Sequence, residues 1–109
     1  MTRWGSDIDV RDLAEARSEG VNHTLLDVRE AEEVAVCTIP DSLYISMRQV
    51  PAHLDELPRQ HPLVVMCHHG GRSHMVAEFL RGNGFTNVHN LAGGIDDWAQ
   101  TIDREMPRY

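Results

Sequence analysis

The feature that most constrains the fold is a run of four apolar residues, Leu63–Met66, which a polar, glycine-containing loop follows directly. A strand that is apolar at every position is typical of the centre of a parallel sheet, where both faces are covered. The rest of the chain alternates short apolar runs with amphipathic stretches. Together these patterns predict an α/β fold around a central strand at residues 63–66.

The same patterns place the other elements. Further strands are predicted at residues 8–10, 24–28, 43–45 and 88–91, and helices at 10–19, at 72–81, after the acidic residues near 30, within 47–56, and from Gly93 onward. The side chains expected to point inward are Leu54, Leu57, Val76, Ala77, Phe79 and Leu80. The sum is a five-stranded parallel sheet with helices on both faces. Ligands bind beyond the carboxyl ends of the strands in such sheets, which points to Cys67.

Length and composition limit the class of protein. The chain has 109 residues, of which 41% are hydrophobic and 25% charged, and no domain boundary, so residues 1–109 are expected to form a single domain. A net charge of −7 argues against nucleic acid or an anionic membrane surface as the main partner. The sequence has no apolar run long enough for a membrane span and no signal peptide, and two cysteines suit a reducing compartment. We therefore expect a cytoplasmic protein.

The charge is unevenly distributed. Residues 57–77 carry two of the 10 basic side chains and none of the 17 acidic ones, so this segment is +2 and the remaining residues sum to −9. Its basic and titratable side chains are Arg59, His61, His68, His69, Arg72 and His74. An acid-free segment in an acidic protein is a candidate anion site. The alternative is a chance cluster of histidines on a solvated loop.

Residues 67–73, called the cysteine loop below, contain the candidate chemistry. Cys67 stands where a strand ends and a helix begins, and there the helix dipole and free backbone N–H groups favour thiolate. Gly70 and Gly71 allow backbone N–H groups to turn inward and bind an anion. Arg72 supplies a positive fork that matches an oxyanion, and Ser73 supplies a hydroxyl or a helix cap. The alternative is an inert cysteine at the end of a core strand.

The histidines allow a second interpretation. His68 and His69 could join Cys67 as metal ligands, but adjacent residues rarely point at one ion and no second Cys/His pair has suitable spacing. No metal site is therefore predicted, and the pair is expected to shape the loop or to add positive charge. His23, His53 and His89 are interpreted as surface or hydrogen-bonded residues.

A cysteine followed by an anion cradle suits two chemistries, phosphate ester hydrolysis and sulfur transfer. Four residues separate Cys67 from Arg72, one fewer than in protein tyrosine phosphatases. The shorter loop closes a tighter ring, which suits a single outer sulfur atom better than a phosphoryl group.

These residues resemble the rhodanese (thiosulfate sulfurtransferase) family, specifically its single-domain members. Four blocks carry the resemblance, in order and at fitting separations: Leu26-Asp27-Val28-Arg29-Glu30 with Glu32-Glu33, Ile39-Pro40, the cysteine loop, and Gly84-Phe85 through Leu91-Ala92-Gly93-Gly94-Ile95 with Trp98. The sequence departs from the family beside Ile39-Pro40, where Cys37-Thr38 precedes it and Asp41-Ser42 follows it. These departures affect a turn and its contacts more than the chemistry.

The resemblance implies a ping-pong sulfurtransferase in which Cys67 accepts the outer sulfur of a donor such as thiosulfate and passes it from a persulfide to a thiol, a protein or cyanide. The N–H groups from His68 to Ser73 would stabilise the persulfide anion, and no metal or organic cofactor is implied. Asp27 and Arg29 either support the loop or form a structural ion pair. Cys37 is either a resolving thiol or a side chain that fills a small space.

Three other functions stay open from the sequence. One is a catalytically silent rhodanese-like interaction module, although such modules often lose the cysteine. The others are a phosphatase or arsenate reductase and a metal-binding site. The expected partners are a small anionic sulfur donor and a thiol or protein acceptor, with neither nucleic acid nor a membrane.

Overall fold

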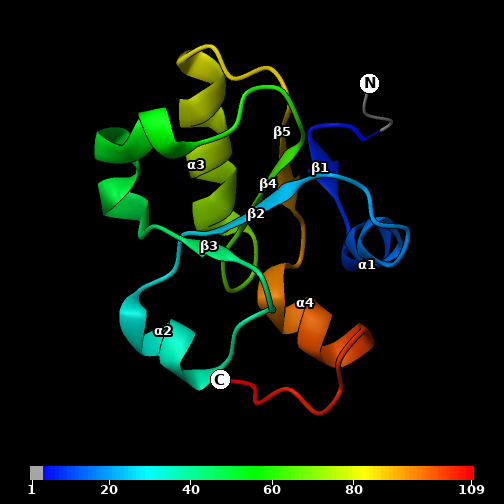
Figure 1. The fold of residues 1–109 in the computed structure, drawn as a ribbon. Coiled ribbons are helices and arrows are strands. Elements are labelled where there is room, and N and C mark those ends of the chain that lie inside the picture. Colours follow the sequence, from blue (N-terminus) through cyan, green and yellow to red (C-terminus); the bar gives the residue numbers. More distant parts are fainter. Residues whose placement is uncertain (1–3) are drawn as a thin grey trace.

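The computed structural model describes residues 4–109. Its elements in chain order are β1 (Asp7–Ile8), α1 (Val10–Ser18), β2 (Thr24–Asp27), α2 (Ala31–Val36), β3 (Leu43–Tyr44), the 3-10 segment η1 (Met47–Glu56), β4 (Leu63–Met66), α3 (Gly71–Gly82), β5 (Val88–Leu91) and α4 (Gly94–Thr101). The five strands form one parallel sheet in the order β1-β5-β4-β2-β3 (Figure 1). The predicted α/β fold with β4 at its centre is confirmed.

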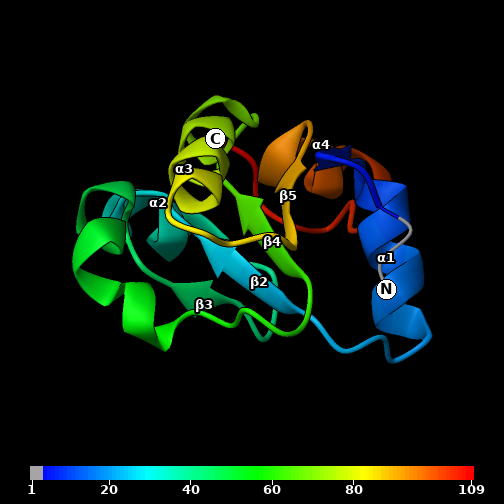
Figure 2. The same ribbon diagram turned by 90° about the horizontal axis from the view of Figure 1, so that it is seen from above.

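Two helical layers cover the sheet. Successive strand side chains point to opposite faces, so Leu63 and Val65 of β4 pack with α3 and η1, whereas Val64 and Met66 pack with α1 and α4. Figure 2 shows α3 and η1 on one side of the sheet and α1 and α4 on the other. All four residues of β4 are buried, as its apolar run predicts.

Two local expectations are wrong. The predicted strand at residues 8–10 stops at Ile8, because the Asp9 side chain caps α1 in a reciprocal pair with Asp12. The predicted burial of Phe79 is also wrong, since 40% of this side chain is exposed. The buried face of α3 is Ser73, Val76, Ala77 and Leu80, a spacing of three and four residues that turns Phe79 away from the sheet.

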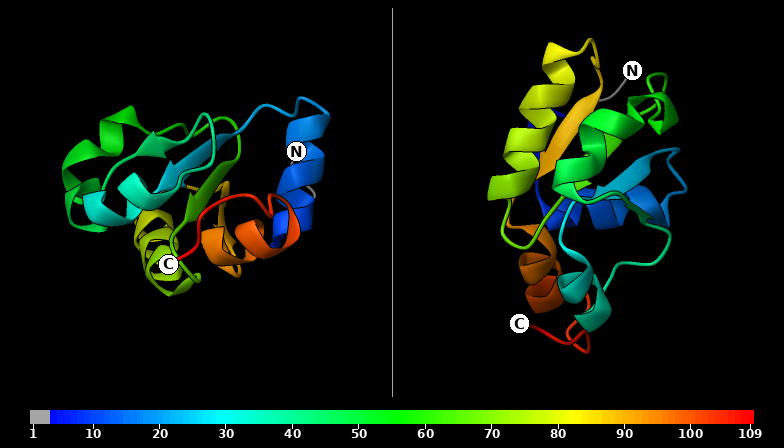
Figure 3. Two further views of the ribbon diagram at one scale, coloured as in Figure 1. Left: turned by 90° about the horizontal axis from the view of Figure 1, so that it is seen from below. Right: turned by 90° about the vertical axis from the view of Figure 1, so that its left-hand side faces the viewer.

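The segment after α4 returns to the carboxyl end of the sheet. It passes from α4 to α2, so the last residues lie beside α2 (Figures 1 and 3). Tyr109 thereby comes close to the carboxyl ends of the strands. Within residues 4–109, no helix is long and apolar enough to cross a membrane.

Candidate functional site

Cys67 lies at the carboxyl end of β4, and the cysteine loop closes around its sulfur. The backbone N–H of Gly70 donates to Sγ over 3.0 Å, and the hydroxyl of Ser73 lies 3.3 Å from Sγ. Gly70 adopts φ 112°, a conformation that suits glycine and turns its N–H inward. Cys67 is only 1% exposed, so the sulfur lies at the bottom of the ring of donors.

This environment sets the ionisation of the thiol. Burial raises the pKa of Cys67, but the Ser73 hydroxyl and the backbone N–H groups of Ser73, Gly70 and His69 bring the pKa below its ordinary value. Neutral donors aimed at the sulfur therefore favour the thiolate, which is the nucleophilic form.

Behind Ser73 lies Asn90, which the sequence analysis did not single out. The Ser73 hydroxyl lies 2.5 Å from Asn90 Oδ1, and Asn90 Nδ2 donates to Asp7 Oδ1 over 3.0 Å and to Gly70 O over 3.3 Å. Asn90 is only 5% exposed. Because a buried amide requires hydrogen-bond partners, a polar residue in a predicted core strand was the available signal, although His89 beside it gives the same signal.

The first turn of α4 holds the other side of the loop. The N–H groups of Ile95 and Asp96 donate to the carbonyls of Cys67 and His68 over 2.9 and 3.1 Å. A Cβ at Gly94 would collide with these two carbonyl oxygens, and Gly94 has φ 60°. The loop carbonyls are thus bonded outward, which leaves its N–H groups free to face the sulfur.

Arg72 does not present a free positive charge. Its guanidinium forms a bidentate pair with Glu33 of α2, with N–O distances of 2.6 and 2.8 Å. Hydrogen bonding from Arg72 lowers the pKa of Glu33 to about 2, and the same pairing raises the pKa of Arg72. The sequence predicts that this fork binds an oxyanion, and in the structure the oxyanion on it is the Glu33 carboxylate.

Asp27 and Arg29 form a buried ion pair at the end of β2. The shortest N–O distance is 2.7 Å, and the exposed fractions are 1% and 0%. Arg29 also donates to the carbonyls of Cys37 and Glu33 and to the Tyr109 hydroxyl. Among the described residues, no hydrogen bond joins this pair to the cysteine loop. The pair therefore orders α2 and Tyr109, and supports the loop only through them.

The two loop histidines differ. The His68 ring stacks on Tyr109 with centroids 3.9 Å apart, and His69 lies 3.9 Å from its other side. Burial and the nearby His69 lower the pKa of His68, which favours the neutral ring at pH 7. His68 therefore shapes the loop and adds little positive charge. His69 is largely exposed, and residues 4–109 contain no group of three or more side chains placed to hold a metal ion.

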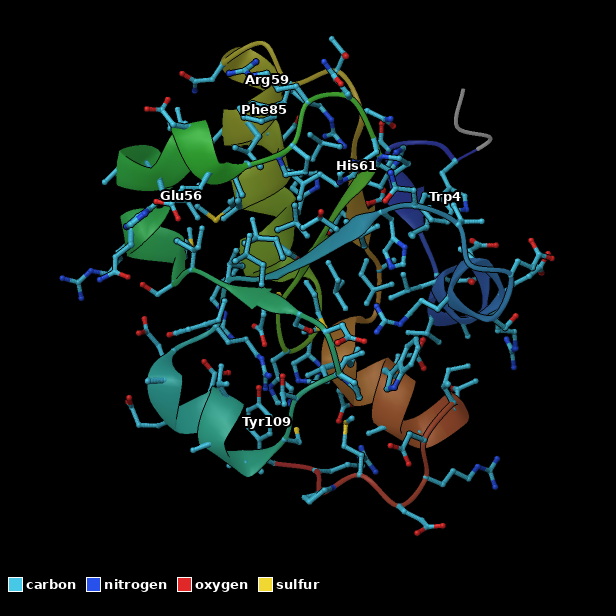
Figure 4. The ribbon with its side chains drawn as sticks, in the orientation of Figure 1. Trp4, Glu56, Arg59, His61, Phe85 and Tyr109 are labelled. Carbon is cyan, nitrogen blue, oxygen red and sulfur yellow. The ribbon has the colours of Figure 1, made fainter. Side chains whose placement is uncertain are left out.

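The acid-free segment does not form one positive surface. The strand β4 lies within this segment and places residues 57–62 at the end of the sheet opposite the cysteine loop. There His61 hydrogen-bonds Thr24. Arg59 covers the Phe85 ring, with its guanidinium carbon 3.8 Å from the ring centroid. Figure 4 shows Arg59, His61 and Phe85 at the end of the molecule opposite Tyr109. Arg59 and His61 therefore do not belong to the candidate anion site at Cys67.

Cys37 lies on the other face of the sheet. It packs with Ile39, Val64 and Met66, whereas Cys67 packs with the α3 side of the core. Both cysteines are free and buried. This arrangement favours the space-filling role of Cys37 over a resolving thiol.

Comparison with known proteins agrees with the fold. Residues 9–101 match the rhodanese-like domain. A protein named sulfurtransferase from Allochromatium vinosum is 33% identical over 95 residues, which cover 87% of this chain and 89% of that protein. The thiosulfate sulfurtransferase GlpE of Pseudomonas syringae is 35% identical over 74% of this chain and 76% of its own.

Solved structures agree with these relatives. The crystal structure of a rhodanese-related protein from Thermoplasma volcanium superposes with a TM-score of 0.79 at 32% identity, over 88% of this chain and 92% of that one. A rhodanese-like domain protein from Staphylococcus aureus gives a TM-score of 0.81 at 30% identity, over 86% and 91% of the two chains. The family expected from the sequence is confirmed, and the chain belongs to the rhodanese-like domain family.

Proposed function

We propose that this chain is a sulfurtransferase that moves a sulfane sulfur from a donor such as thiosulfate to a thiophilic acceptor through a persulfide on Cys67. The observation that carries the proposal is the ring of donors around Sγ, from Gly70 and Ser73, in a chain whose relatives are named sulfurtransferases. Residues 1–109 act in this proposal as one domain, with the cysteine loop as the catalytic and substrate-binding segment.

The reaction has two displacement steps. In the first, the Cys67 thiolate attacks the outer sulfur of thiosulfate, a new S–S bond forms, the S–S bond of the donor breaks, and sulfite leaves with the electron pair. In the second, an acceptor thiolate or cyanide attacks the terminal sulfur, and the Cys67 thiolate leaves. The total charge is conserved in each step.

The N–H groups that favour the thiolate also suit the persulfide. A persulfide places its terminal sulfur one bond further from the Cβ, inside the same loop of Gly70 and Gly71 backbone. Preorganised dipoles stabilise such an anion without reorganising during the reaction. Two buried free thiols are compatible with a reducing compartment, and we propose the cytoplasm.

The test is to trap the intermediate. The protein is incubated with thiosulfate and its intact mass is measured under non-reducing conditions. We expect a gain of one sulfur atom that cyanide removes. The gain should disappear in Cys67→Ser and persist in the matched control Cys37→Ser.

The other outcomes identify the alternatives. A folded protein that gains no sulfur from thiosulfate or from a persulfide donor would be a non-catalytic interaction module. Hydrolysis of an aryl phosphate that depends on Cys67 would indicate a phosphatase.

A further inference from the structure

The carboxylate of Glu33 lies on the Arg72 guanidinium of the cysteine loop. The fold places this acid on the guanidinium that would otherwise bind the negative charge of an anionic donor. Glu33 Oε2 accepts from Arg72 Nη1 over 2.6 Å, and Oε1 accepts from Arg72 Nη2 over 2.8 Å. This is the bidentate geometry in which a guanidinium binds an oxyanion. Glu33 therefore occupies the edge of the Arg72 guanidinium that could otherwise bind an oxyanion in the same geometry.

The carboxylate is held in place by two further donors. The Tyr109 hydroxyl donates to Oε1 over 2.9 Å, and the backbone N–H of Glu30 donates to Oε2 over 3.0 Å. Tyr109 is itself held by Arg29, which donates to its hydroxyl over 3.0 Å, and by stacking on His68. Four donors on one carboxylate distinguish this contact from a mobile surface ion pair.

The other charges near the site are also paired. Arg29 pairs with Asp27, and Arg108 pairs with Asp96 over 3.1 Å. Asp96 also lies 3.9 Å from each of the loop histidines. Within the described residues, the dipoles of the cysteine loop attract an anion, but no unpaired cation next to Cys67 adds to them.

We infer that Glu33 is a specificity-determining residue that disfavours small sulfur donors with an oxyanion group beside the transferred sulfur, such as thiosulfate, and favours donors that lack such a group, such as organic persulfides. This inference rests on the proposed function, since it names the donor class of the same site. For a neutral persulfide donor, the Cys67 thiolate takes the outer SH sulfur, the S–S bond of the donor breaks, and the donor leaves as a thiolate. No oxyanion then has to displace Glu33 from Arg72.

The first test compares two alkylating agents of similar size in a Cys37→Ala background. Iodoacetate is an anion and iodoacetamide is neutral, and both react with the Cys67 thiolate. The ratio of their rate constants therefore reports the potential at the sulfur, independently of the thiolate fraction. Glu33→Gln keeps the size and an acceptor oxygen but removes the charge. We expect the iodoacetate/iodoacetamide ratio to rise roughly three- to tenfold, as for the loss of one nearby, partly screened charge.

Glu32→Gln is the matched control. Glu32 lies on the same helix and is exposed, so the substitution removes the same charge without breaking the Arg72 pair. Its ratio should change by less than about twofold, because solvent screens exposed charges. An unchanged ratio in Glu33→Gln, or an equal rise in both variants, would overturn the inference.

A second measurement does not depend on access of the alkylating agents to Cys67. In Cys67→Ser, thiosulfate binds but cannot react, so calorimetry gives its dissociation constant directly. Adding Glu33→Gln should tighten thiosulfate binding about three- to tenfold, and adding Glu32→Gln should not. Equal affinities in all three proteins would refute the role of Glu33. If these binding and alkylation results hold but no protein acquires a persulfide, the proposed function fails while the charge effect of Glu33 stands.

Discussion

The hydroxyl of Ser73 offers the sharpest test of how the site activates its thiol. This hydroxyl has one proton and two acceptors, Asn90 Oδ1 at 2.5 Å and Cys67 Sγ at 3.3 Å. When Cys67 is a thiol, it can donate to Ser73 while Ser73 donates to Asn90. When Cys67 is a thiolate, it competes with Asn90 for the Ser73 proton.

The magnitude follows from this competition. A hydrogen bond to a charged group contributes roughly 1.5–3 kcal/mol. Since the shorter contact of Ser73 is with Asn90, we take the lower end, about 1.5 kcal/mol, which is a factor of about ten in the acid constant. Ser73→Ala should therefore raise the pKa of Cys67 and lower its thiolate fraction about tenfold at pH values below the titration midpoint.

Asn90→Leu should act in the opposite direction. Leucine is close to asparagine in size but accepts no hydrogen bond, so the Ser73 proton becomes fully available to the thiolate. We expect the pKa of Cys67 to fall and its alkylation at acidic pH to become a few-fold faster, by up to about 1 kcal/mol of added stabilisation. In the double variant Ser73→Ala/Asn90→Leu this gain should vanish, because the hydroxyl is absent.

The assay is the pH dependence of iodoacetamide alkylation in a Cys37→Ala background. It reports the thiolate of Cys67 alone. If Ser73→Ala leaves the profile unchanged, the hydroxyl does not stabilise the thiolate. If both single variants shift the profile in the same direction, Asn90 acts only by supporting the loop, and the competition is refuted.

Three further predictions concern stability and can be checked by urea unfolding. Gly94→Ala should lower the free energy of unfolding by at least about 2 kcal/mol and slow Cys67 alkylation, because its φ of 60° and the nearby loop carbonyls exclude a Cβ, whereas Gly82→Ala meets open space and should have little effect. Arg29→Met should lower the free energy of unfolding by about 3–5 kcal/mol, since it leaves the buried Asp27 carboxylate unpaired, and adding Asp27→Asn should recover part of that loss. The pKa of Glu33 falls from 4.5 to about 2 on folding, so its contribution to the free energy of unfolding is complete above pH 4.5 and is lost as the pH falls towards 2. Glu33→Gln should reduce this acid-induced loss of stability, and a pH profile equal to that of the unmodified protein would contradict this prediction.

The elements that the sequence predicts well are those with a local signal. The apolar run of β4 marks a central strand, and the glycines after Cys67 mark a loop that can turn N–H groups inward. Helix faces are harder to predict, as Phe79 shows: the sequence pattern places it on the buried face of α3, but it lies beside that face and is 40% exposed. Phe79 and Leu80 are adjacent on α3, and the rotation of the helix by one residue turns Leu80 towards the sheet and Phe79 away from it.

The parts of the site that the sequence did not predict come from residues far apart in the chain. Glu33 meets Arg72 across 39 residues, and Tyr109 meets Glu33 across 76. No periodicity or spacing encodes such pairings, since they depend on where α2 and the last residues pack. Asn90 is intermediate, because the sequence shows a polar side chain within a predicted strand but does not show its partner Ser73.

These distant contacts refine the physical account of how Cys67 is activated. The sequence predicts that the helix dipole and backbone N–H groups favour the thiolate and that Arg72 adds a positive charge for an oxyanion. In the structure the nearest guanidinium is paired with Glu33 and the His68 ring favours its neutral form, so the stabilisation comes from backbone N–H groups and one hydroxyl. Dipoles fixed by a loop act on the sulfur at short range, whereas a free arginine would also attract anions from further away. Different groups therefore control the two properties of the site. The donors of the cysteine loop set the reactivity of the Cys67 sulfur, and in our inference Glu33 determines which donors reach that sulfur.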